Sequence, residues 1–142
     1  MSTSDLPINL LISRTAKALS RAFEDALVTA GGSTPTWLVL SALATGEHRT
    51  QGELADRLGI RQPTLTHHLD TLERAGFVTR VREPENRRIQ RVVVTDAGSR
   101  LFLRLRRAAG SFDGRLRAGL DDDDDAALRR LLAQLTENAQ PD

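Results

Sequence analysis

The sequence predicts a mainly α-helical protein with one small β-hairpin, an α+β fold. Apolar residues recur at three- and four-residue steps over most of the chain, and two β-branched runs at residues 77–82 and 89–94 interrupt that period. The composition, 39% hydrophobic and 27% charged, is typical of a folded globular chain. A length of 142 residues suits one domain, so residues 1–142 are expected to form a single domain around one core.

The first apolar-periodic stretch predicts a long helix over residues 6–28. Ser4 or Asp5 can cap its start, because a side-chain oxygen there accepts from a free amide of the first turn. The glycine pair at residues 31–32 supplies a stop that tolerates left-handed backbone. One face of this helix should be mostly buried, and Arg14 falls on that face.

Two shorter helices follow. Pro35 marks the start of a largely apolar helix over residues 34–46. Thr50 and Glu53 then match a capping box, in which each side chain satisfies a free amide at the start of a third helix. That third helix is short and closes at Gly59.

The fourth helix, residues 62–75, is apolar on one side and polar at its leading end. Leu65, Leu69 and Leu72 share one face, and Gly76 terminates the helix. The leucines are therefore expected in the core, and the polar side chains outside it.

The charged segment 83–88 joins the two β-branched runs as the tip of a hairpin. Thr95 caps a helix expected over residues 96–120. A last helix begins at the five aspartates of residues 121–125 and continues to about Leu135. Aspartates suit a helix start, and this run lacks the spaced ligands, glycine and closing glutamate of a calcium loop.

The third and fourth helices, with a glycine-containing turn between them, form a helix-turn-helix, and the hairpin makes it winged. The expected winged lobe is residues 34–95. In this arrangement the second helix of the motif enters the major groove of DNA, where its first residues meet the base edges. The residues of this helix that are expected to contact DNA are Arg61, Gln62, Pro63, Thr64, Thr66, His67 and His68.

Charge is distributed unevenly, although the formal net charge is only +1. Lys17 is the single lysine, every other basic residue is arginine, and arginines gather in the winged lobe. Arginine at the tip of a thin hairpin suits the narrow minor groove, so double-stranded DNA is the expected partner. The wing residues that are expected to contact DNA are Arg82, Arg87, Arg88 and Arg91.

For the adjacent His67 and His68, the alternative to DNA contact is an ordinary pair of solvated side chains. Neighbouring side chains on a helix point about 100° apart, so these two cannot share one metal ion as an i, i+4 pair could. The chain has no cysteine, which excludes disulfides, thiolate zinc sites and thiol redox switches. We expect no metal site and no cofactor.

No motif indicates an enzyme, and no catalytic residue is expected. His48 lies in a loop, no serine occupies a nucleophile-elbow pattern, and no glycine-rich phosphate loop occurs. No apolar run reaches the roughly 18 residues of a membrane span, and the N-terminus lacks the pattern of a secretory signal. A cytoplasmic protein without a membrane partner is therefore expected.

Five segments resemble the MarR family of bacterial winged-helix transcription regulators. They are TPTWLVL at residues 34–40, QGELADRLG at 51–59, TLTHHLDTLERAGFV at 64–78, EPENRR at 83–88 and VTDAG at 94–98. The resemblance extends to length and helix order over nearly the whole chain. One position departs from it, because the family often has an aspartate just before the wing arginine pair and this sequence has Asn86.

The resemblance implies a homodimeric repressor that a small molecule releases. Residues 5–31 and 96–139 would form dimerisation helices, and two lobes would bind a pseudo-palindromic operator about 34 Å apart. Similar regulators bind small anionic or phenolic ligands between the dimer helices and the lobe. Arg14 and Trp37 are the expected ligand-binding residues, with an internal ion pair as the alternative for Arg14 and core packing for Trp37. The alternative function is a winged-helix module that acts mainly through protein or RNA partners.

Overall fold

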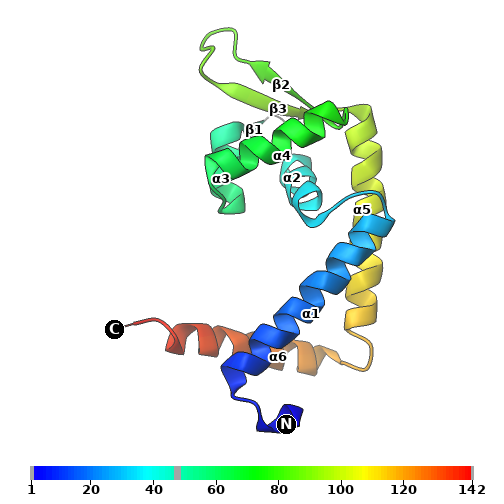
Figure 1. Cartoon of the computed structure of the whole chain (residues 1–142), viewed down its shortest axis with the longest axis vertical. Coiled ribbons are helices and arrows are strands. Elements are labelled where there is room, and N and C mark those ends of the chain that lie inside the picture. Colours follow the sequence, from blue (N-terminus) through cyan, green and yellow to red (C-terminus); the bar gives the residue numbers. More distant parts are fainter. Residues whose placement is uncertain (1, 47–48, 142) are drawn as a thin grey trace. The chain divides into compact units, whose positions relative to one another are not determined.

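The computed structural model describes residues 2–46 and 49–141. In chain order its elements are η1, a 3-10 turn (Thr3–Asp5), α1 (Ile8–Thr29), α2 (Thr34–Ala44), β1 (Arg49–Thr50), α3 (Gln51–Leu58), α4 (Gln62–Arg74), β2 (Val78–Arg82), β3 (Gln90–Val94), α5 (Asp96–Leu116) and α6 (Asp122–Asn138). This order confirms the predicted mainly α fold, a winged helix-turn-helix with long helices before and after it (Figure 1).

The chain divides into two compact units, Met1–Gly110 and Ser111–Asp142. The first unit contains the winged helix-turn-helix together with α1 and most of α5. The second contains the end of α5 and the whole of α6.

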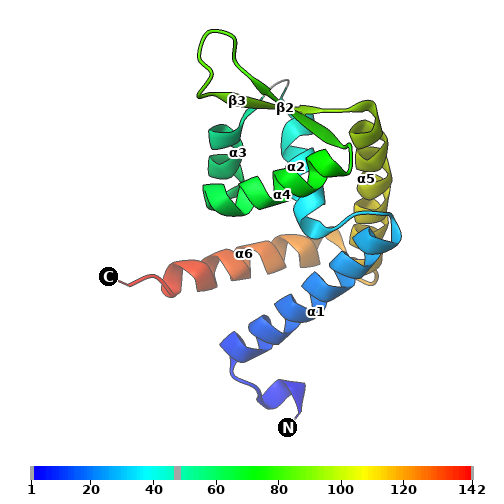
Figure 2. The same cartoon turned by 45° about the horizontal axis from the view of Figure 1, so that its top comes forward.

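The core of the first unit consists of aliphatic side chains from α1 to α5 and from strands β2 and β3. Figures 1 and 2 show α2, α3 and α4 gathered beside the sheet. Burial of one such leucine or valine contributes about 1.5–3 kcal/mol, so these side chains account for the compactness of the lobe. The large side chains that are less than 2% exposed are Leu27, Leu40, Leu54, Leu65, Leu69, Leu101, Leu105, Val39, Val78 and Val92.

Helix α1 begins later than the sequence predicted. Its N-cap is Pro7, which makes no side-chain cap bond, so the prediction that Ser4 or Asp5 caps this helix is wrong. The residue before a proline is pushed out of the helical region, and Leu6 is extended at φ −76° and ψ 138°. The preceding 3-10 turn, Thr3–Asp5, therefore cannot continue into α1.

Helix α2 is capped by Ser33, whose hydroxyl accepts from the Thr36 amide at 3.2 Å. Thr34 instead donates its amide and its hydroxyl to Glu24 Oε2, at 2.7 and 2.5 Å, which ties α2 to α1. In the described parts of the chain, no single helix has the length and apolarity of a membrane crossing. Only α1 and α2 taken together have that length and apolarity, and this pair is bent by 75° at its junction.

The sheet is antiparallel in the order β1-β3-β2. Val78 lies opposite Val94, which confirms the predicted hairpin, and the loop that joins its strands extends beyond the helices (Figure 2). Strand β1, which pairs Arg49 with Val92, was not predicted, because two residues are too few to show an alternating pattern.

Candidate DNA interface

The turn between α3 and α4 sets the start of α4 against α3. Thr50 caps α3 by accepting from the Glu53 amide at 3.1 Å, which confirms one half of the predicted capping box. Among the bonds of the described residues, the Glu53 side chain does not return a bond to the Thr50 amide. Gly59 closes α3 in the left-handed region at φ 64°, a conformation that glycine adopts without steric cost. The Ile60 amide then donates to the Ala55 carbonyl at 3.1 Å, which completes the helix end and directs the chain into α4.

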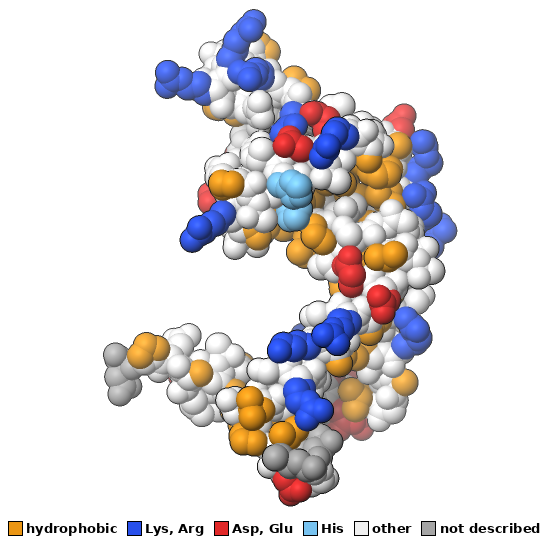
Figure 3. All heavy atoms as spheres, viewed as in Figure 1, with side chains coloured by type: hydrophobic (Ala, Val, Ile, Leu, Met, Phe, Trp, Pro, Cys, Tyr) orange, Lys and Arg blue, Asp and Glu red, His pale blue; other side chains and the backbone are white. Residues whose placement is uncertain are grey.

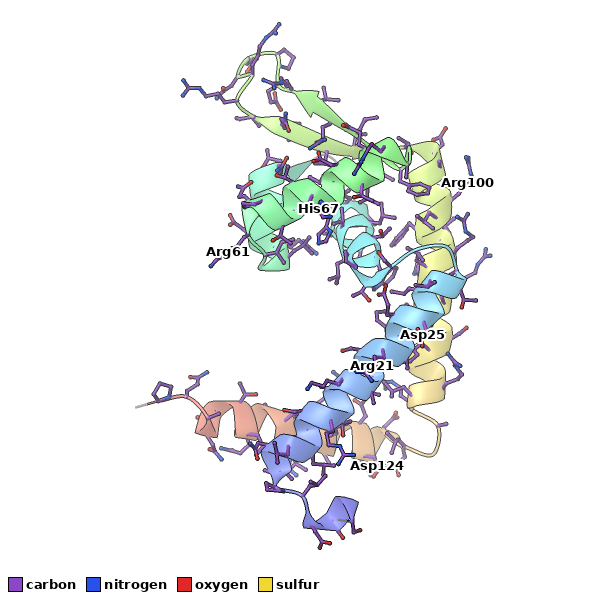
Figure 4. All side chains as sticks on the ribbon, viewed as in Figure 1. Arg21, Asp25, Arg61, His67, Arg100 and Asp124 are labelled. Carbon is purple, nitrogen blue, oxygen red and sulfur yellow. The ribbon has the colours of Figure 1, made fainter. Side chains whose placement is uncertain are left out.

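Helix α4 is buried on one side and polar at its leading end. Leu65, Leu69 and Leu72 are buried, as predicted. The N-cap residue Arg61 makes no side-chain cap bond, so the free amides of the first turn remain available to an anion. Figure 4 shows Arg61 and His67 projecting from the helix into solvent. Of the predicted contact residues, Arg61, Gln62, Pro63, Thr64 and His67 are exposed, and Thr66 and His68 are half-buried.

The rings of His67 and His68 lie 6.0 Å apart and are inclined by 53°. The two rings therefore form a tilted pair on the surface of α4. His48, which the sequence analysis assigned to a loop, lies outside the described residues. Within residues 2–46 and 49–141, no group of three or more His, Asp or Glu side chains is arranged to hold a metal ion.

The tip of the hairpin is basic and exposed. Figure 3 shows basic side chains gathered at this tip, and both Arg87 and Arg88 are exposed. The Asn86 side chain accepts from the Arg88 amide at 3.2 Å, so it orders the backbone before the arginine pair as a short carboxylate would. Arg82 donates to the Arg87 carbonyl at 3.4 Å, and Arg91 forms an ion pair with Glu83. The arginines at the tip are thus more available to an anion than Arg91 is.

An ion-pair cluster joins the wing to the far end of α4. The Arg80 guanidinium donates to Asp70 Oδ1 at 2.5 Å and to Glu73 Oε1 at 3.0 Å, and the Arg80 amide donates to Glu73 Oε2 at 2.9 Å. These bonds from Arg80, the side-chain bond first, hold the pKa of Glu73 below its ordinary value. The bond to Glu73 raises the pKa of Arg80. The single guanidinium offsets one of the two negative charges at this end of α4, and the three bonds fix β2 on α4.

Comparison with known proteins agrees with this arrangement. Residues 31–89 match a model described as the MarR family. The transcriptional regulator PA3341 has 31% identity to the chain and a TM-score of 0.73, over 93% of this chain and 97% of that one. The chain belongs to the MarR family. This confirms the resemblance found in the sequence and places the chain among DNA-binding transcriptional regulators.

Two structures of a MarR-family neighbour contain bound molecules. The transcriptional repressor CouR, bound to a 23-mer DNA duplex, has 28% identity and a TM-score of 0.82, with 94% of each chain covered. CouR from Rhodococcus jostii RHA1, bound to p-coumaroyl-CoA, has 25% identity and a TM-score of 0.76, with 100% of this chain and 99% of that chain covered.

A concavity of about 600 Å³ lies where the starts of α3 and α4 meet the wing. Its walls combine amide and hydroxyl groups with one basic side chain, Arg88, and one acidic side chain, Glu53. The amides and the guanidinium suit a base edge and a phosphate, whereas the Glu53 carboxylate would repel a phosphate placed beside it. Of the residues predicted to contact DNA, the concavity brings together Gln62 from α4 and Arg88 from the wing. The lining residues are Thr50, Gln51, Gly52, Glu53, Gln62, Arg88, Ile89 and Gln90.

The two residues predicted to bind a ligand lie elsewhere. Trp37 is half-buried and stacks on Phe102, with ring centroids 5.7 Å apart and planes inclined by 13°. Arg14 is exposed, which corrects the expectation that it lies on a buried face. The expectation failed because Leu27 is the buried residue of α1, so most of this helix remains open to solvent within one protomer.

Sequence reasoning missed two functional features. Asp70 and Glu73 lie one turn apart on α4, a spacing that could have indicated a shared cationic partner, yet only the fold identifies it as Arg80. The sequence predicted no role for Gln51, whose side-chain amide contacts Thr66.

Proposed function

We propose that this MarR-family protein is a sequence-specific regulator of transcription that binds double-stranded DNA as a homodimer and acts as a repressor. The observation that carries the proposal is the joining of a polar helix end and an arginine-tipped hairpin around one concavity. Gln62 from the former and Arg88 from the latter face the same space, so a single stretch of duplex can meet both. The structure of the DNA-bound repressor CouR, which this chain resembles, supports repression rather than activation.

In this proposal α4 reads bases and the wing reads shape. Side chains at the leading end of α4 enter the major groove, where each base pair presents a distinct pattern of donors and acceptors. Arg87 and Arg88 enter the neighbouring minor groove, with Arg82 and Arg91 nearer the phosphates. The proposed winged lobe is residues 34–95.

The proposed dimer uses the terminal helices, residues 5–31 and 96–139. Helix α6 has no buried residue, although it carries a row of leucines. Ile8 and Leu10 at the start of α1 are likewise exposed. A second copy would cover these apolar side chains, and a two-fold axis would match a pseudo-palindromic operator.

The proposed effector is a small anionic or phenolic molecule. The p-coumaroyl-CoA bound to CouR combines a phenol with phosphates, and the match to CouR covers 100% of this chain. We assign Arg14 to the anion and the Trp37 ring to the aromatic part, because an exposed guanidinium and a half-buried indole offer those two chemistries. Arg14→Ala should then weaken release of DNA by the effector without changing DNA affinity.

The central experiment is selection of bound sequences from a random duplex pool, followed by a salt titration of the best binder. We expect Arg87→Ala to weaken binding across all sequences and to reduce the slope of log K against log salt by about 1. We expect His67→Ala to relax the base preference at one position of each half-site. Equal and sequence-independent losses in both variants would contradict a reading role for α4. A wild type without base preference or steep salt dependence would favour the alternative, a module for protein or RNA partners.

A further inference from the structure

A single hydrogen bond connects α3 to the recognition surface of α4. Gln51, the first residue of α3, donates from Nε2 to Oγ1 of Thr66 at 2.5 Å. Both side chains are half-buried, and Gln51 lines the concavity between α4 and the wing. The bond therefore lies at the edge of the surface that a duplex would cover.

The direction of this bond decides which part of the Thr66 hydroxyl remains free. A side-chain amide nitrogen can only donate, so Gln51 occupies a lone pair of the hydroxyl and leaves its hydrogen unused. Elsewhere, Thr29, Thr71 and Thr136 donate their hydroxyl hydrogens to the carbonyl four residues earlier, at 3.0, 3.1 and 3.0 Å. Within the described residues, Thr66 makes no such bond, and its contact with Gln51 is the one its hydroxyl makes.

The position of Thr66 directs this hydrogen to the proposed major-groove contact. Thr66 follows Gln62 by one helical turn, so the two side chains share a face of α4. Gln62 is exposed and lines the concavity. When a duplex displaces water from this face, a hydroxyl hydrogen without an acceptor would carry a desolvation cost.

We propose that Gln51 determines operator specificity through Thr66. By donating to one of the two lone pairs of the hydroxyl and leaving its hydrogen unused, Gln51 favours Thr66 as a hydrogen-bond donor. At one position of each half-site, Thr66 then prefers guanine or thymine, which present acceptor oxygens in the major groove, over cytosine, which presents an amino donor. This inference rests on the proposed function of sequence-specific DNA binding. Gln51 acts as a positioning residue, and Thr66 makes the contact.

The test compares base preferences selected from a random duplex pool by the wild type and four variants. Thr66→Val keeps the shape of the side chain and removes the hydroxyl, so it identifies the operator position that Thr66 reads. Gln51→Met keeps the chain length and removes the donor, and we expect the preference at that position to fall at least threefold, with other positions unchanged. Gln51→Glu replaces a donor with an acceptor, so the hydroxyl turns its hydrogen to the carboxylate, and we expect the preference to shift toward cytosine.

Gln90→Glu is the matched control, because Gln90 lines the same concavity and gains the same negative charge. It should lower overall affinity and leave the base preference unchanged. Circular dichroism melts establish that each variant is folded, and Gln51→Met decides the question if Gln51→Glu does not fold.

Three results would overturn the inference while leaving the proposed function intact. The first is a selective wild type whose preference Thr66→Val does not alter at any position. The second is an unchanged preference in folded Gln51→Met. The third is a wild-type preference for cytosine at the position identified by Thr66→Val. A wild type that selects no sequence would overturn the proposed function and this inference with it.

Discussion

Helices α4 and α6 carry the same kind of leucine pattern and use it differently. Helix α4 buries Leu65, Leu69 and Leu72 against the rest of the winged lobe. Helix α6 buries none of its residues, and Leu131 and Leu132 are 51% and 41% exposed. A hydrophobic stripe therefore predicts that a helix will pack, but not whether its partner belongs to the same chain.

The features that hold α6 together are local. Asp121 and Asp124 form a capping box, in which each side chain accepts from the other's amide, at 2.8 and 3.1 Å. Arg129 reaches back to Asp125 at 2.7 Å, one turn earlier. A capping residue stabilises a helix by about 1 kcal/mol, less than the burial of one leucine, and the solvent-exposed Arg129–Asp125 pair adds little to this. A helix of this length is marginal without tertiary packing, which is why we assign α6 to the proposed dimer interface.

The comparison is tested most strongly by truncating one leucine in each helix. Leu69→Ala should lower the free energy of unfolding by about 2–5 kcal/mol, because it leaves a cavity in a closed core. Leu131→Ala should change it by no more than about 0.5 kcal/mol, measured by urea unfolding at low protein concentration with Trp37 as the fluorescent probe. Similar losses in the two variants would mean that the α6 leucine is already buried within one protomer.

Two glycines of α5 test how tightly each unit is packed. A Cβ at Gly98 would lie 2.1 Å from the Phe77 carbonyl oxygen, so Gly98→Ala should cost about 1–3 kcal/mol, as overpacking does. A Cβ at Gly114 would meet nothing within 4 Å, so Gly114→Ala should raise stability by up to about 1 kcal/mol through helix propensity. Thermal melts of both variants measure the difference, and a shift of the same sign in both would contradict it.

Self-association should depend on the leucines of α6. Replacing Leu131 and Leu132 together with serine should weaken dimerisation at least tenfold, or about 1.4 kcal/mol, because each removes apolar surface from the proposed interface. Sedimentation equilibrium over a range of concentrations gives the dissociation constant. Val81→Ser is the control, since Val81 is an exposed apolar residue of the wing. An equal effect of the control would show that general surface polarity, rather than α6, sets the association.

The smallest expected effect concerns the ion pairs of the two units. The bond from Arg80 lowers the pKa of Glu73 below 4.5, so its stabilisation is complete above pH 4.5 and is lost as pH falls below that value. Because Glu73 is partly exposed, Glu73→Gln should cost no more than about 1 kcal/mol at neutral pH, and the difference from wild type should shrink as pH falls through the lowered pKa of Glu73. Urea midpoints measured across this range test the prediction.

Asp125→Asn is the counterpart in α6. The hydrogen bond from Arg129, together with the charge of Arg117 at 3.1 Å, likewise lowers the pKa of Asp125, but both pairs lie on the open surface, where solvent and salt screen them. We expect no measurable change in the urea midpoint at any pH. A loss as large as that of Glu73→Gln would indicate that α6 is buried by a partner under the conditions used.

Much of the fold followed from patterns a few residues long. The cap at Thr50, the stop at Gly59, the leucine stripe of α4 and the capped start of α6 were all predicted, because each depends on contacts within one or two turns. The start of α1 was predicted wrongly because Pro7 restricts the residue before it, an effect that outweighed the capping residues nearby.

The sequence by itself determined the helices and the hairpin strands, apart from the exact start of α1 and the short strand β1. It also determined the polar leading end of α4 and the arginine tip of the hairpin, because side-chain chemistry and helical or strand period act over short distances. Only the tertiary structure decided which of these groups meet. The contact of Gln51 with Thr66 and the cluster of Arg80 with Asp70 and Glu73 join separate elements. Their partners depend on how helices pack around a core, where many side chains of similar chemistry could have served.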